Sequence, residues 1–277
     1  MRAGGHACTG ALAGALSSHA VASATGAGLG PAATAVGALL GAGAALLPDL
    51  DADGATAYRS GGRITAALGE LFQFLARTAF ARTRLPHDPR GDGEHRGLVH
   101  TPVFALVVGL LVGLGALATP WVTTVVLVVV LAPGISALSR SGPRWVHTRL
   151  HLDREGEALL TAIGVVLVLE VTGAVHALGW YAGVSIAVGM IVHSAGDSAT
   201  HSGIPWTWPL RRRCRRCSGR SSRCPGTRWR RGHLLPEALR WRVGSVRGKR
   251  IEQAIEVICL LLVTALLVPD LAAVLSS

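Results

Sequence analysis

Charge and cysteine are both scarce in this chain of 277 residues. Only 16% of the residues are charged, against about 25% in soluble domains, while 50% are hydrophobic. This composition argues against an ordinary cytosolic enzyme and excludes an intrinsically disordered chain. Five cysteines in so long a chain exclude a secreted disulfide scaffold. Lysine is nearly absent, since Lys249 is the single lysine among 27 basic residues, and we interpret this as compositional bias of the genome.

The chain also lacks the short motifs of several enzyme classes. It contains no G-x-S-x-G nucleophile elbow, no P-loop and no H-E-x-x-H zinc motif. The net charge of +11 would suggest a nucleic-acid partner in a soluble protein. In a membrane protein the same charge is first an orientation signal, so we expect no nucleic acid.

Long hydrophobic runs are abundant, and a membrane span needs about 20 apolar residues. We predict an all-α, polytopic membrane helix bundle of about seven spans. The first two are rich in glycine and alanine, which lets helices approach closely. The predicted spans are His6–Ala24, Gly26–Leu47, Pro102–Thr119, Trp121–Leu138, Ala158–Val175, Leu178–Asp197 and Ala254–Val268.

The basic residues give this bundle an orientation. With these seven spans, every arginine falls on one side, which the positive-inside rule makes cytoplasmic. We therefore predict a single domain over residues 1–277 in the bacterial plasma membrane, with the N-terminus inside. Residues 48–100 form a cytoplasmic loop whose helix at 68–80 lies on the membrane surface or packs against the core. Residues 210–250 form an arginine-rich cytoplasmic loop that attracts anionic headgroups of membrane lipids.

Histidine and aspartate collect at the cytoplasmic ends of the predicted spans. Ionisable residues at such positions are costly and are functional candidates by default. Singly, each is explained as an interfacial histidine or a turn aspartate. Together they predict a site for one or two divalent metal ions, and mixed His and carboxylate ligands suit Zn²⁺, Mn²⁺ or Fe²⁺, with Mg²⁺ as a further candidate. The predicted ligands are His6, Asp49, Asp51, His95, His100, His193 and Asp197.

The spacing of these residues lets them converge. His193 and Asp197 are four residues apart, so they share one face of a helix. His95 and His100 are five apart and precede Thr101–Pro102, a helix cap followed by proline at the first helical position. We therefore expect both histidines in a loop that can turn them toward the same ion.

The same pieces resemble the YdjM-type family of inner-membrane-associated proteins, which are regarded as metal-dependent hydrolases. The resemblance covers nearly the whole chain in order, although Val99 stands where the family commonly has threonine. It implies a multi-span membrane protein with hydrolase activity and leaves the substrate open. The matching pieces are His6, Leu47–Asp51, the HRG-x-x-H-T run His95–Thr101, His193–Thr200, Trp208–Pro209 and Arg250–Glu252.

These observations predict a metal-dependent hydrolase at the cytoplasmic face, acting on a lipid or lipid-linked phosphoester because its site lies at headgroup depth. Asp51 is the candidate general base. Arg96 is placed to neutralise an anionic group of the substrate. The alternative is a non-catalytic membrane protein, either a transporter or a scaffold whose arginine-rich loop recruits a partner.

A second group of metal-ligand types lies in that loop. Cys214, Cys217, Cys224 and His233 have the irregular spacing C-x2-C-x6-C-x8-H. A zinc knuckle and a redox-sensitive thiol cluster beside arginine both remain open for them.

Overall fold

The computed structural model describes residues 1–26, 31–91, 93, 95–141, 157–177, 179–213 and 226–275. The chain is helical, and outside its helices the described residues form only isolated bridges. The elements are α1 (Ala3–Thr25), α2 (Pro31–Ala44), η1 (Leu47–Asp51), α3 (Thr56–Ser60), α4 (Arg63–Thr83), η2 (Leu98–His100), α5 (Pro102–Ala118), α6 (Trp121–Ser141), α8 (Glu157–Val171), η3 (Ala174–Ala177), α9 (Tyr181–Ser198), η5 (Glu237–Leu239) and α10 (Val246–Leu275).

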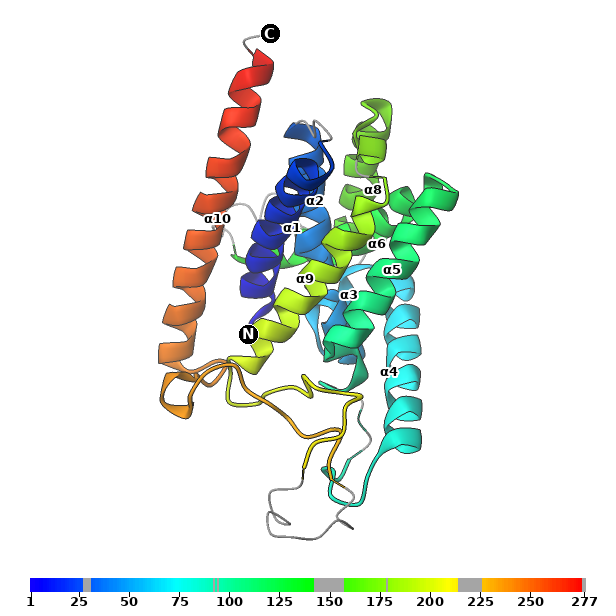
Figure 1. Ribbon diagram of the computed structural model, residues 1–277. Coiled ribbons are helices and arrows are strands. Elements are labelled where there is room, and N and C mark those ends of the chain that lie inside the picture. The colour runs from blue at the N-terminus through cyan, green and yellow to red at the C-terminus, as the bar shows by residue number, and fades with distance from the viewer. Residues whose placement is uncertain are drawn as a thin grey trace.

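Helices α1, α2 and α9 pack against one another at the centre of the bundle (Figure 1). Small residues make this packing close, because a Cβ atom on Gly14 of α1 would meet the carbonyl oxygen of Gly37 on α2. The tight pairing predicted for the two N-terminal helices is confirmed. Around them the hydrophobic core includes Leu40, Leu131 and Met190.

Two helical stretches, Ala32–Asp51 and Val246–Val268, are long and apolar enough to cross a membrane by length and composition. The first is mostly buried in the bundle, whereas the second lies in α10 at its edge and is mostly exposed (Figure 1). Two shorter apolar helices are Pro102–Ala118 and Trp121–Ala137. The all-helical fold is confirmed, and the number of seven spans stays a prediction.

Helix α4 is longer than the predicted 68–80 segment. Its residues Phe72, Ala76 and Phe80 are buried against the core, and Phe80 packs edge-on against Trp229 with ring centroids 5.3 Å apart. Leu71 and Phe74 on the same helix are exposed, at 48% and 63%. One face of α4 therefore packs inward, as a core helix does, and another presents apolar side chains outward.

The segment from α9 to α10 folds back beneath the helices and is fastened at several points (Figure 1). Ile204 and Gly232 form a two-way backbone bridge, with N–H to oxygen distances of 2.7 and 3.2 Å. Asp88, in the loop after α4, accepts backbone hydrogen bonds from Arg228 and Trp229. Cys214, Cys217 and Cys224, for which a zinc knuckle and a redox-sensitive cluster were both open, lie outside the described residues.

Candidate metal centre

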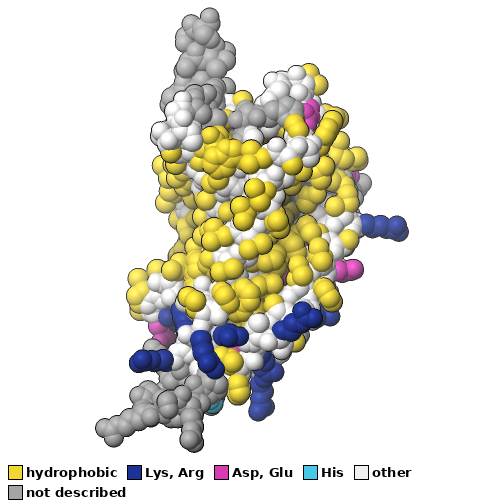
Figure 2. All heavy atoms as spheres, turned by 45° about the vertical axis from the view of Figure 1, so that its right-hand side comes forward, with side chains coloured by type: hydrophobic (Ala, Val, Ile, Leu, Met, Phe, Trp, Pro, Cys, Tyr) yellow, Lys and Arg dark blue, Asp and Glu magenta, His cyan; other side chains and the backbone are white. Residues whose placement is uncertain are grey.

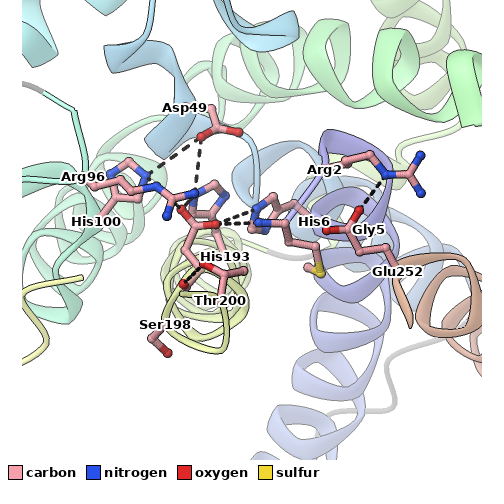
Figure 3. Close-up of polar contacts among 12 residues, drawn as sticks. Arg2, Gly5, His6, Asp49, Arg96, His100, His193, Ser198, Thr200 and Glu252 are labelled. Carbon is pink, nitrogen blue, oxygen red and sulfur yellow. Dashed lines mark hydrogen bonds and ion pairs between the residues drawn. The ribbon is translucent and has the colours of Figure 1, made fainter. Parts of the chain in front are cut away.

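Four segments that are far apart in sequence meet at one end of the bundle. They are the start of α1, the short helix η1, the loop that leads into η2, and the end of α9 (Figure 3). Local sequence explains two of these positions. Pro48 is the second residue of η1, and Pro102 begins α5, where the Thr101 hydroxyl accepts a hydrogen bond from the Phe104 amide at 3.2 Å.

Helix α9 carries two of the predicted ligands on one face. His193 and Asp197 are both buried, and His193 Nε2 lies 3.7 Å from Asp197 Oδ2. The other ring nitrogen, Nδ1, lies 2.7 Å from the carbonyl oxygen of Ala45. A neutral imidazole that donates from Nδ1 to this carbonyl directs the lone pair of Nε2 into the cluster.

His6, near the N-terminus, contacts the end of α9. His6 is fully buried and stacks on the His193 ring, with centroids 3.8 Å apart and planes 18° apart. Asp49 of η1 lies on the other side of these rings, with Oδ1 3.6 Å from His193 Nε2 and 3.9 Å from His100 Nε2 (Figure 3).

His95 and His100 both contact Asp51. His95 lies in the loop as expected, whereas His100 ends the short helix η2. Asp51 Oδ1 lies 2.8 Å from His95 Nδ1, and Asp51 Oδ2 lies 3.4 Å from His100 Nδ1. His100 is in η2 and fully buried, whereas the His95 side chain is 48% exposed. His95 thus lies at the solvent edge of the cluster.

All seven predicted ligands fall into three overlapping groups whose ligand atoms lie within 4.8 Å of one another. The groups are His6, Asp49 and His193; Asp51, His95 and His100; and His100, His193 and Asp197. His193 belongs to the first and third of these groups, and His100 to the second and third.

Several ligand atoms of these groups lack a hydrogen-bond partner. Among the described residues, both ring nitrogens of His6 and of His100, His193 Nε2 and Asp197 Oδ2 are buried without a hydrogen bond. Each buried unpaired polar group costs about 1–3 kcal/mol. A cation would satisfy one nitrogen of each histidine together with the Asp197 oxygen, so the residues present fit a divalent metal ion.

Electrostatics at His100 also favour a positive charge. Burial alone would lower the pKa of this imidazole, but the carboxylates of Asp51, Asp197 and Asp49 outweigh burial and raise it. The same carboxylates would attract a metal ion in place of the proton.

Two further cationic groups contact Asp197. The Met1 ammonium group lies 2.7 Å from Asp197 Oδ1, and Arg96 Nε lies 3.0 Å from Asp197 Oδ2. Arg96 is the only described residue other than glycine with positive φ, at 57°. Its amide donates to Asp51 Oδ2 at 3.3 Å, which helps to hold this costly backbone conformation.

Fold and site together define a helical protein with membrane-type apolar helices and a buried histidine–aspartate centre at one end. The model of the YdjM inner membrane protein family matches residues 1–273, so the chain belongs to this family of inner membrane proteins. Comparisons with curated proteins and with solved structures gave no match.

Proposed function

We propose that this protein is a membrane-bound metal-dependent hydrolase. The observation that carries the proposal is the cluster of seven histidine and aspartate side chains, five of them buried, in which His6, His100, His193 and Asp197 have buried atoms without a hydrogen bond among the described residues. Zn²⁺, Mn²⁺ and Fe²⁺ suit its mixed ligands best, and Mg²⁺ is a further candidate. When bound, such an ion supplies an acidified water at neutral pH and polarises the scissile group.

The protein side chains would divide the remaining work. His193, oriented by the Ala45 carbonyl, and His100 would hold the ion together with Asp49 and Asp197. Asp51 contacts both His95 and His100, so it is placed either to ligate or to accept a proton as the general base. In either role it also fixes the orientation of the two imidazole rings.

A cavity gives the cluster access to the outside. It has a volume of about 520 Å³ and is lined by Arg2, Asp49, Thr56, Gln253 and Glu256 among others. This volume is within the range of about 300–1,000 Å³ that is typical of small-molecule sites. Asp49 is the one predicted ligand in its wall, with a side chain that is 21% exposed.

We infer that the centre lies at the cytoplasmic face of a multi-pass protein. In Figure 2, arginine and lysine side chains gather toward the lower end of a largely hydrophobic surface. The positive-inside rule makes that end cytoplasmic and leaves the N-terminus inside. A centre at headgroup depth favours a lipid or lipid-linked phosphoester as substrate, and the arginine-rich loop would contact anionic lipid.

The proposal is tested by the metal content of the protein purified in detergent. We expect near-stoichiometric metal by mass spectrometry in the wild type, and its loss in both His193→Ala and Asp49→Ala, which change residues from different segments. His201→Ala is the matched control, because His201 is exposed and belongs to none of the three ligand groups. Loaded protein would then be screened on phosphoester lipids.

A wild-type protein that takes up none of the four metals would overturn the hydrolase proposal. The cluster would then act only in helix packing. Metal lost in one variant and kept in the other would contradict a single shared centre.

A further inference from the structure

A second, smaller cavity lies against the metal cluster and is rich in arginine. It has a volume of about 110 Å³, and its lining includes His95 of the cluster and Arg96, which contacts Asp197. Its other charged lining residues among those described are Arg90 and Arg231. The two acidic residues of the adjoining loop, Asp92 and Glu94, lie outside the described residues. We call this space the arginine cavity.

Its walls leave room for a ligand. Besides the charged residues and His95, the lining consists of glycines, prolines and the aromatic residues Phe80 and Trp229. The volume is well below the range of about 300–1,000 Å³ for drug-sized ligands, so the cavity suits one small group.

Arg96 connects the arginine cavity with the metal centre. Its Nε is held by Asp197, while the terminal nitrogen Nη1 is buried and has no hydrogen-bond partner among the described residues. A guanidinium presents several donors in a fixed plane. One edge of this group is therefore occupied by the cluster, and another donor is left for a ligand.

Arg231 is positioned by its neighbours on both sides. Trp229 is buried, and its amide donates to Asp88 Oδ1 at 2.9 Å. Gly232 is bridged to Ile204 by two backbone hydrogen bonds. Arg231 lies in the two-residue stretch between these fastened points and lines the same cavity as Arg96, although it is far from Arg96 in the sequence.

Arg96 and Arg231 both line the cavity, and their like charges repel each other. Partial desolvation and the positive charge of Arg96 lower the pKa of Arg231. An anion between them would relieve this repulsion and would accept hydrogen bonds from both arginines. Arginine pairs of this kind match the several oxygens of a phosphate group.

We propose that the arginine cavity binds one phosphate group, with Arg96 and Arg231 as its principal ligands and Arg90 at its rim. This inference deepens the proposed function, because it makes the substrate a phosphate compound whose anionic group lies next to the metal centre. The cavity itself is built without the metal, so it can be tested separately.

The test uses the full chain in a neutral, phosphate-free detergent after treatment with EDTA. Binding of radiolabelled inorganic phosphate is measured by equilibrium dialysis. We expect saturable binding in the wild type, at least tenfold weaker binding in Arg231→Gln, and intermediate weakening in Arg231→Lys, which keeps the charge and loses the planar fork. Arg242→Gln is the matched control, because Arg242 is an exposed arginine outside the cavity.

Metal content separates this proposal from the previous one. Arg231→Gln should keep the wild-type metal stoichiometry, which also shows that the variant is folded. Phosphate binding that is absent in the wild type, unchanged in Arg231→Gln, or equalled by acetate would overturn the phosphate site, whatever the metal content.

The source of the phosphate group is distinguished by a second arm in lipid nanodiscs. If phosphatidic acid in the disc reduces the binding of inorganic phosphate relative to phosphatidylcholine alone, the site takes a lipid headgroup. If it has no effect, the site takes a soluble phosphate compound. Both results retain the arginine cavity as a phosphate site.

Discussion

Two buried aspartates, Asp88 and Asp197, are found in opposite situations. Asp88 is 5% exposed and accepts three backbone hydrogen bonds, from Leu85 at 2.8 Å and from Arg228 and Trp229 at 2.7 and 2.9 Å. Asp197 is 1% exposed and has an oxygen, Oδ2, without any hydrogen bond among the described residues. Imidazole nitrogens and Arg96 surround that oxygen instead.

This difference separates a structural carboxylate from one that is arranged for a ligand. Among the described residues, every hydrogen-bond donor to Asp88 belongs to the backbone, so its charge is used to fasten the loop at Trp229 to the end of α4. The groups around Asp197 include histidine nitrogens that have no hydrogen bond among the described residues. Burial therefore does not indicate function by itself, whereas the state of the neighbouring polar atoms does.

The largest effect that we predict falls on metal affinity. Asp197→Asn keeps the size of the side chain and removes its negative charge, so metal affinity should fall at least about 100-fold. The matched variant Asp88→Asn should keep full metal content. Metal analysis of both proteins after dialysis against a buffered metal series measures the difference. Equal affinities in the two variants would remove the distinction between the two aspartates.

The candidate site was largely predictable from sequence because its residues lie in short, locally determined units. The i,i+4 pair on α9, the proline at the start of η1, and the Thr101–Pro102 cap each fix a direction without any knowledge of the rest of the fold. The seven predicted spans placed all of them at one end of the bundle, and the structure brings them together there, although the number of spans itself stays a prediction.

The arginine cavity could not be predicted in this way. Arg231 belongs to a basic run that the sequence explains as a topology signal or a lipid contact, and no periodicity connects it with Arg96. The connection depends on two long-range contacts that involve backbone atoms. The Trp229 amide donates to the Asp88 carboxylate, and Gly232 bonds to the backbone of Ile204. The lengths of α4 and α10 were likewise underestimated, since polar residues continue both helices beyond their apolar stretches.

The next effect falls on stability. Asp88→Ala removes three hydrogen bonds to a charged group and leaves buried amides unpaired, so we expect a loss of about 3 kcal/mol in the free energy of unfolding. Thermal unfolding in detergent measures this loss. The control is Asp53→Ala, because Asp53 accepts an exposed hydrogen bond from the Gln73 side chain. Metal content should stay at the wild-type level, and its loss in Asp88→Ala would show that this carboxylate serves the metal centre as well.

The smallest effect that we predict is a dependence of stability and metal affinity on pH, caused by the titration of His100. Because the folded pKa of this imidazole is raised, its protonation stabilises the metal-free protein fully below the unfolded value of about 6.5. That contribution is lost as the pH rises through the higher folded pKa. Metal binding needs the neutral ring, so metal affinity should instead rise with pH over the same range, by at most about tenfold per pH unit.

Unfolding temperatures of EDTA-treated and metal-loaded protein between about pH 6 and about pH 8 test this opposition. The EDTA-treated wild type should lose more stability over this interval than His100→Gln, whose side chain does not titrate. The metal-loaded wild type should gain stability relative to the metal-free form as the pH rises, because His100 then exchanges its proton for the ion. Parallel curves for the two forms of the wild type would show that the proton and the metal do not compete for His100. His100 would then have a structural role, like that of Asp88.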